Sequence, residues 1–142
     1  ACMMGFAKDL QDATDYSPAV PKVGVFTAPV SYSDMENKEV AESSMDLCAR
    51  VISVFKCHKA CPLTAASAIS VAVKLDGSIV QKTLGAGIGD TPTVRIGHSS
   101  GVMTMVPTVV KNGPDMNNAK VPGVAVQRTA RRIMDGTLYI RN

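Results

Sequence analysis

The feature that most constrains the fold is a run of small, uncharged residues in the middle of the chain. Between Ala65 and Val73 no residue carries a charge and none is larger than isoleucine. The run lies within Pro62–Leu75, which we predict to be a helix, and a helix without a polar face must be covered by other elements. We therefore expect the rest of the domain to wrap around this segment.

The size of the chain allows such a wrapping. It has 142 residues, 46% of them hydrophobic, which suits a single domain with its own core. No apolar stretch approaches the ~20 residues that cross a bilayer, and Lys8, Asp9 and Asp12 argue against a signal peptide. We expect a soluble domain with no membrane partner.

The cysteines indicate a reducing compartment. Cys2, Cys48, Cys57 and Cys61 are irregularly spaced in a chain large enough to fold by packing alone, so we expect reduced thiols and a cytoplasmic location. Cys57, His58 and Cys61 lie close together, but the second ligand pair of a structural zinc site is missing. No metal is predicted.

Short β-branched segments around the helix predict strands, although the alternation in the second of them is also compatible with a helix. They are Val23–Thr27, Met45–Val54, Ser78–Leu84, Thr93–Ile96 and Val102–Val110. Apolar spacing predicts an amphipathic helix over Cys2–Leu10, and Asp76-Gly77 predicts a turn. Polar loops are expected at 31–42 and 111–120, and helical turns followed by a strand over 128–140.

Two glycine-rich segments are similar to catalytic motifs without meeting their requirements. Gly97 to Gly101 matches G-x-S-x-G, but a hydrolase elbow needs a following helix and a later histidine, and no histidine follows Ser99. The segment is better interpreted as a turn whose backbone N–H groups and hydroxyls can bind an anion. The glycine spacing in Gly85–Asp90 does not fit a dinucleotide loop and predicts a turn.

The beginning of the central helix is a second candidate anion site. The N–H groups near Pro62–Ala65 carry partial positive charge, Thr64 adds a hydroxyl, and Lys56, His58 and Lys59 add a positive field. These groups suit a carboxylate. The alternative is that Thr64 only caps the helix and His58 is a solvated loop residue; the residues alone leave both open.

The basic residues are concentrated at the end of the chain. The net charge is +3, with −1 over residues 1–110 and +4 over 111–142, where Arg128, Arg131 and Arg132 cluster. Few aromatic residues are available for base stacking, and Asp135 follows the cluster closely. We expect no nucleic-acid partner.

Four segments follow one another in the order of a known family's motifs. The opening G-x-A-K-D and A-T-x-Y-x-P patterns are matched by Gly5, Ala7, Lys8, Asp9, Ala13, Thr14, Tyr16 and Pro18. The K-x-H-x-A-x-x-x-T-A-A segment is matched by Lys56, His58, Ala60, Thr64, Ala65 and Ala66. The G-H-P-S-G turn is matched by Gly97, His98, Ser100 and Gly101, with Ser99 replacing proline. The R-T-A-R-x-x-M-x-G segment is matched by Arg128, Thr129, Ala130, Arg131, Met134 and Gly136. Taken together and in this order, the four segments resemble the methylaconitate isomerase family, often called PrpF.

The resemblance implies an α+β fold like one half of diaminopimelate epimerase, a β-barrel-like rolled mixed sheet around a central apolar helix. It implies that the chain is the C-terminal half of an isomerase that needs no cofactor and shifts a proton in methylaconitate, aconitate or methylitaconate. Residues 1–126 are then the barrel domain. Residues 127–142 form a closing helical turn and a strand that pairs with the N-terminal half or, in a homodimer, with another chain.

The resemblance also implies where the substrate binds. Its acid and base groups belong to the N-terminal half, so no catalytic residue is assigned here and the chain alone is expected to be inactive. Substrate carboxylates are expected to bind at the helix N-terminus and the hydroxyl-rich turn, with His58 and Arg128 as further candidates. The helix contributes Thr64 and Ala65, and the turn contributes His98, Ser99, Ser100 and Gly101. The second catalytic cysteine of the epimerases falls at Pro62, so that role is absent. A non-catalytic carboxylate-binding or scaffold domain with this fold is the alternative.

Overall fold

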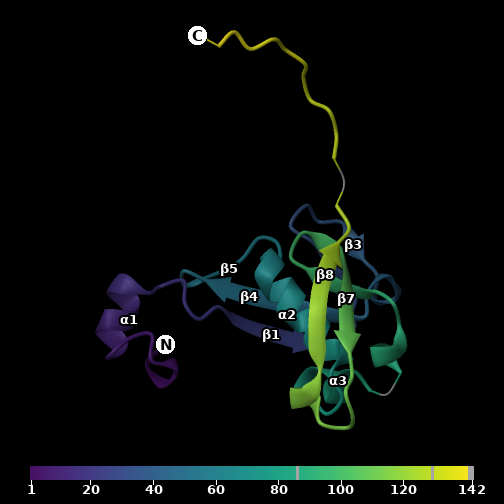
Figure 1. The fold of residues 1–142 in the computed structure, drawn as a ribbon. Coiled ribbons are helices and arrows are strands. Elements are labelled where there is room, and N and C mark those ends of the chain that lie inside the picture. The colour runs from purple at the N-terminus through teal and green to yellow at the C-terminus, as the bar shows by residue number, and fades with distance from the viewer. Residues whose placement is uncertain (86, 129, 141–142) are drawn as a thin grey trace.

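The computed structural model describes residues 1–85, 87–128 and 130–140, which form an α+β domain (Figure 1). Its strands are β1 (Val23–Thr27), β2 (Tyr32–Ser33), β3 (Glu39–Val40), β4 (Leu47–Ser53), β5 (Lys56–Cys57), β6 (Val94–His98), β7 (Gly101–Val110) and β8 (Lys120–Val126). Its α-helices are α1 (Leu10–Tyr16), α2 (Leu63–Lys74) and α3 (Ile79–Leu84). Short 3-10 turns are η1 (Cys2–Met4), η2 (Glu42–Ser44), η3 (Ile88–Asp90) and η4 (Met116–Asn118).

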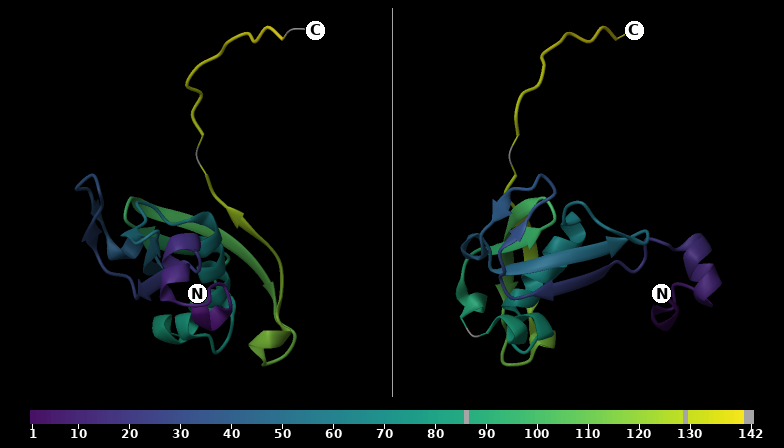
Figure 2. Two further views of the ribbon diagram at one scale, coloured as in Figure 1. Left: turned by 90° about the vertical axis from the view of Figure 1, so that its left-hand side faces the viewer. Right: turned by 180° about the vertical axis from the view of Figure 1, so that it is seen from behind.

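A six-stranded mixed sheet forms the body of the domain. Its order is β1-β4-β6-β7-β8, with β5 paired to β4, and the β2–β3 hairpin stands beside it as a separate ladder. Strands β4 and β6 are parallel, with Leu47 opposite Ile96, and the other pairs are antiparallel. The strands curl into a half-barrel around α2 (Figures 1 and 2). This confirms the predicted rolled sheet around a central helix.

The core lies between α2 and the concave side of the sheet. Ala66, Ser70 and Val73 on one side of α2 are 0% exposed. They face the buried side chains of the strands, which are Leu47, Ala49, Val51, Val94, Ile96 and Met105. The strand predicted within Met45–Val54 is confirmed as β4, and its alternate residues Leu47, Ala49 and Val51 lie in the core. Successive residues of a strand point to opposite faces, which explains this alternation. The strand predictions at Val23–Thr27, Thr93–Ile96 and Val102–Val110 are confirmed as well.

The expectation that α2 is covered on every side is met on one side only. Thr64 and Ala68 are exposed, and a groove of about 520 Å³ runs between α2 and β1. Its walls include Val20, Phe26 and Ile69. The physical reason is that β1 and β8 are the two edges of the described sheet, so the half-barrel leaves one side of the helix open.

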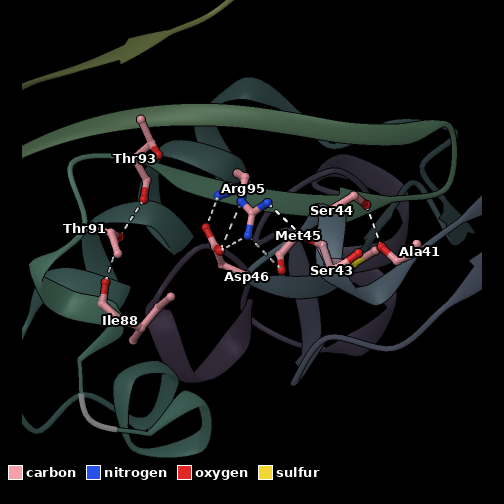
Figure 3. Close-up of polar contacts among 9 residues, drawn as sticks. All are labelled: Ala41, Ser43, Ser44, Met45, Asp46, Ile88, Thr91, Thr93 and Arg95. Atoms are coloured by element: carbon pink, nitrogen blue, oxygen red, sulfur yellow. Dashed lines mark hydrogen bonds and ion pairs between the residues drawn. The ribbon is translucent and has the colours of Figure 1, made fainter.

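An ion pair joins the parallel strands β4 and β6, whose ladder contains only the pairs Leu47–Ile96 and Cys48–Gly97 (Figure 3). Nη2 of Arg95 in β6 lies 2.7 Å from Oδ1 of Asp46, and the Arg95 backbone N–H donates to Oδ2 across 2.7 Å. In return the Asp46 backbone N–H donates to the Arg95 carbonyl across 2.8 Å. Arg95 also donates to the carbonyl of Ser43. These contacts hold the start of β4 against β6.

The helix predicted over Cys2–Leu10 is wrong. Turn η1 ends at Gly5, whose φ of 75° is left-handed, and α1 begins only after Asp9. The Asp9 carboxylate accepts a hydrogen bond from the Asp12 backbone N–H across 2.8 Å. A capping aspartate therefore sets the start of the helix later than apolar spacing indicates. Helix α1 lies apart from the sheet, beyond the far ends of β1 and β4 (Figure 1).

The strand predicted over Ser78–Leu84 is also wrong, because α3 forms there. The Ser78 hydroxyl accepts from the Gln81 backbone N–H across 3.0 Å, which caps the helix after the turn at Gly77. Val80 and Leu84 then pack against the core. Capping and packing outweigh the β-branched composition of this segment.

Other segments differ from expectation in smaller ways. Strand β8 was not predicted, since Pro122 and Gly123 interrupt its pattern; an edge strand tolerates both. The loop expected at 31–42 contains the β2–β3 hairpin, and the one at 111–120 contains η4. The turn expected at Gly85–Asp90 contains η3, and Ala86 lies outside the described residues.

The end of the chain leaves the body of the domain (Figures 1 and 2). Over residues 127–128 and 130–140 the backbone is neither helix nor strand, so the helical turns and strand predicted there are not formed. Thr129, Arg141 and Asn142 lie outside the described residues. A strand needs a neighbouring strand to form, and the described tail is exposed along its length. None of the helices in the described ranges is long and apolar enough to span a bilayer.

Candidate functional site

The site begins at the tight turn between β6 and β7. His98 and Gly101 are the last residue pair of this antiparallel ladder, and Gly101 has a φ of 120°, which glycine adopts without strain. Strand β7 starts directly at Gly101, so the turn is followed by a strand. The strand–turn–helix geometry of a hydrolase elbow is therefore not formed, as the sequence indicated.

The turn meets the loop that leads into α2. The Ser99 hydroxyl donates to the His58 carbonyl across 3.3 Å, and the Ser100 hydroxyl donates to the Lys59 carbonyl. Cys57 Sγ lies 3.8 Å from Ser99 Oγ. Two segments that are distant in the sequence, both singled out as candidate anion sites, are thus joined by hydrogen bonds at one end of the domain.

His98 is the buried titratable group of this turn. His98 is only 8% exposed. Its Nδ1 accepts a hydrogen bond from the Ser100 backbone N–H across 3.2 Å. Burial lowers the pKa of His98 below 6.5, and the positive charges of Arg50 and His58 lower it further. The neutral ring then carries its proton on Nε2. His98 is therefore a neutral hydrogen-bond donor near pH 7.

The N-terminus of α2 is exposed and has no side-chain cap among the described residues. Pro62 is its N-cap. The alternative that Thr64 caps the helix is therefore wrong, because Thr64 lies inside the first turn. Thr64 and Ala65 both line the groove between α2 and β1. The free N–H groups of the first turn carry the partial positive charge that favours a carboxylate.

The two remaining candidates have weaker positions. His58 is exposed, and its Nδ1 lies 3.1 Å from the backbone nitrogen of Ala60 and 2.9 Å from its carbonyl oxygen, so the ring orders its own loop. Arg128 is exposed just after β8. Within the described ranges no hydrogen bond or ion pair joins Arg128 to the turn.

Sequence reasoning missed three residues that contact this site. The Tyr32 hydroxyl donates to the carbonyls of His98 and Gly101, and the Met35 backbone N–H donates to the carbonyl of Ser99. Arg50 stacks on the Tyr32 ring. Tyr32 and Met35 lie in a segment that was predicted to be a polar loop, and no local pattern indicates its contact with a turn more than sixty residues away.

The cysteines form no second site. Cys48 and Cys61 are buried, Cys57 is exposed, and all four cysteines are free thiols. Within the part of the chain that the structure describes, no group of three or more histidine, cysteine and acidic side chains could hold a metal ion.

Comparisons with known proteins identify the family of the chain. Residues 1–141 match the family model described as PrpF protein. The 3-methylitaconate isomerase of Eubacterium barkeri is 36% identical over 138 residues, which are 96% of this chain and 34% of the relative. The 2-methyl-aconitate isomerase of Shewanella oneidensis is 33% identical over 140 residues, which are 99% of this chain and 34% of the relative.

A solved structure has the same fold. The crystal structure of a methylitaconate-delta-isomerase superposes with a TM-score of 0.70 at 30% sequence identity, covering 89% of this chain and 33% of that protein. The chain thus spans about a third of the length of the relatives it matches. Because the family model covers nearly all of its residues, the chain belongs to the PrpF family.

Proposed function

We propose that this chain forms the carboxylate-binding side of an isomerase that shifts a proton across an allylic system in an unsaturated di- or tricarboxylate. The observation that carries the proposal is the hydrogen-bonded contact of Ser99 and Ser100 with the loop before α2. The names of the relatives, 3-methylitaconate isomerase and 2-methyl-aconitate isomerase, support this class of substrate.

The chemistry of such a reaction fits the donors found here. Removing a proton from a carbon conjugated to a carboxylate spreads negative charge onto that carboxylate, and fixed hydrogen-bond donors stabilise the charge as it develops. The N-terminus of α2 offers backbone N–H groups and the Thr64 hydroxyl, and His98 offers a neutral N–H. These groups would bind the carboxylates without taking up the migrating proton.

The groups that move the proton are proposed to come from the remainder of a longer protein. The relatives are about three times as long as this chain, and a cleft between two parts of one protein would place acid and base groups opposite this face. The 142-residue chain alone is then expected to bind substrate weakly and to turn none over.

Hydrogen exchange tests the proposal directly. The longer protein is incubated with 2-methylaconitate, aconitate or 3-methylitaconate in deuterated water, and the loss of substrate proton signals is followed by NMR. The 142-residue chain serves as the comparison. Exchange by the longer protein and none by the chain alone is the expected result.

The same experiment decides between catalysis and binding. If the longer protein exchanges none of the three acids, the isomerase proposal is rejected. Calorimetric binding of the acids without exchange would support the alternative, a non-catalytic carboxylate-binding domain of the same fold.

A further inference from the structure

The hairpin β2–β3 holds the candidate site through one phenol. The Tyr32 hydroxyl oxygen lies 2.6 Å from the His98 carbonyl oxygen and 2.7 Å from that of Gly101. These two residues face each other across the end of the β6–β7 ladder. A single hydroxyl therefore joins both ends of the turn, sharing its one proton between two carbonyl acceptors.

The same hairpin contacts the tip of the turn. The Met35 backbone N–H donates to the Ser99 carbonyl across 2.9 Å, and the Ser100 hydroxyl lies 3.8 Å from Met35 Sδ. The carbonyls of His98, Ser99 and Gly101 are thus all bound by residues 32–35. This leaves the conformation of the turn dependent on a segment that belongs to a different ladder.

Arg50 on β4 holds the Tyr32 ring in place by stacking on it. Its guanidinium carbon lies 4.6 Å from the centroid of the Tyr32 ring, a cation–π distance, and its Nη1 donates to the carbonyls of Ala49 at 2.8 Å and Gly97 at 3.3 Å. The absence of a side chain at Gly97 leaves room for Met45 and for the Tyr32 ring. A Cβ at that position would collide with Met45 Sδ and lie 3.4 Å from Cε1 of Tyr32.

We propose that Tyr32 and Arg50 are positioning residues for substrate binding, because they hold the His98–Gly101 turn in the conformation that presents its donors to a carboxylate. The part that concerns substrate rests on the proposed function, whereas the effect on the turn follows from the contacts alone. Burial raises the pKa of Tyr32, so its hydroxyl keeps the proton that it donates.

The variant Tyr32→Phe in the longer protein tests the proposal. It keeps the ring and its stacking on Arg50 but removes the donor. The backbone amides of Ser99, Ser100 and Gly101 should exchange faster, as measured by hydrogen–deuterium exchange. The KM for the unsaturated acid should rise about threefold to tenfold, the ratio that corresponds to one lost hydrogen bond, with kcat within about twofold. Tyr16→Phe, on a side chain that is 82% exposed, is the matched control and should change neither.

Two variants of Arg50 test the positioning role without changing the Tyr32 hydroxyl. Arg50→Met should loosen the turn and raise KM in the same direction. Arg50→Lys should rescue only part of the effect, because an ammonium lacks the planar fork that stacks on Tyr32 and reaches two carbonyls.

The outcomes separate this proposal from the proposed function. Unchanged amide exchange in Tyr32→Phe overturns the positioning role, and so does faster exchange with an unchanged KM. If the wild-type longer protein shows no isomerase activity, the proposed function fails. Binding of 3-methylitaconate measured by calorimetry then replaces KM, and an affinity equal in wild type and Tyr32→Phe overturns the positioning role.

Discussion

The Ser100 backbone N–H donates to Nδ1 of His98 across 3.2 Å, which ties the imidazole to its own turn. Protonation of Nδ1 would remove the acceptor and place a charge in a buried site beside Arg50. The folded protein therefore favours neutral His98.

The first prediction concerns pH. Because the pKa of His98 is lower in the folded state than its ordinary 6.5, the unfolded state binds the proton more readily. The stabilisation from neutral His98 is fully present above pH 6.5 and is lost as the pH falls below it. Urea unfolding between about pH 7.5 and pH 5.5, above the range where most carboxylates titrate, should show this decrease.

Two variants make the pH prediction specific. His98→Asn retains a side-chain acceptor but does not titrate, so its unfolding free energy should depend less on pH. His58→Gln removes the exposed histidine, which contributes least to the lowered pKa of His98, and should retain most of the dependence. An equal slope in wild type and His98→Asn would contradict the assignment.

The second prediction concerns substrate binding. Thr64→Ala in the longer protein should weaken binding by about 1–3 kcal/mol, the cost of a lost donor at a charged ligand. Ser100→Ala should weaken binding as well, because it removes the bond to the Lys59 carbonyl that holds the turn against the loop before α2. Thr83→Ala on α3, where the hydroxyl donates to the Ile79 carbonyl, is the control. Wild-type kinetics in both site variants would remove Thr64 and Ser100 from the site.

The third prediction concerns the pair that joins β4 to β6. Side-chain exposure is 12% for Asp46 and 40% for Arg95, so solvent screens the pair only in part. Asp46→Ala should lower the free energy of unfolding by about 1–3 kcal/mol in a denaturant titration. Asp46→Asn, which keeps an acceptor for the Arg95 backbone, should cost less. Asp135→Ala breaks the exposed pair with Arg132 and should change stability little; a loss equal to that of Asp46→Ala would refute the prediction.

The fourth prediction compares the two sides of α2. Ala66 is fully buried against the sheet, so Ala66→Leu should overpack the core and destabilise the 142-residue chain by about 1–3 kcal/mol. Ala68→Leu makes the same change on the exposed side, in the groove, and should be tolerated. Thermal unfolding of both variants measures the difference. Equal destabilisation would show that α2 is covered on both sides.

The fifth prediction concerns the tail. Residues 130–140 expose several large apolar side chains, among them Ile133, Leu138 and Tyr139. We expect this segment to pair with another chain or with the remainder of the protein as an added strand. If two copies of the chain pair through the tail, the 142-residue chain should sediment as a dimer. Deleting residues 135–142 should then convert it to a monomer with a lower sedimentation coefficient. Unchanged sedimentation would dismiss pairing between copies.

Much of the fold was predictable because its signals are local. The uncharged run in α2 and the β-branched runs in β1, β4, β6 and β7 predict their own structures from neighbouring residues. Failures came where a single side chain decides, as when Ser78 caps α3 or Asp9 caps α1. Capping acts through one hydrogen bond, and apolar periodicity does not record it.

The candidate site divides in the same way. Residue type and order were enough to predict hydrogen-bond donors in the hydroxyls of the turn and at the N-terminus of α2. That Ser100 reaches the Lys59 carbonyl, and that Tyr32 binds both ends of the turn, depends on contacts between segments far apart in the chain.

The sequence by itself determined the central helix, most of the strands around it, and the motifs of the PrpF family. Only the tertiary structure decided which side of α2 is buried, where the tail lies, and which residues hold the turn. The reason is that burial and hydrogen bonding at these places depend on how the sheet curls and where its edges fall, and the curl results from all strands packing together.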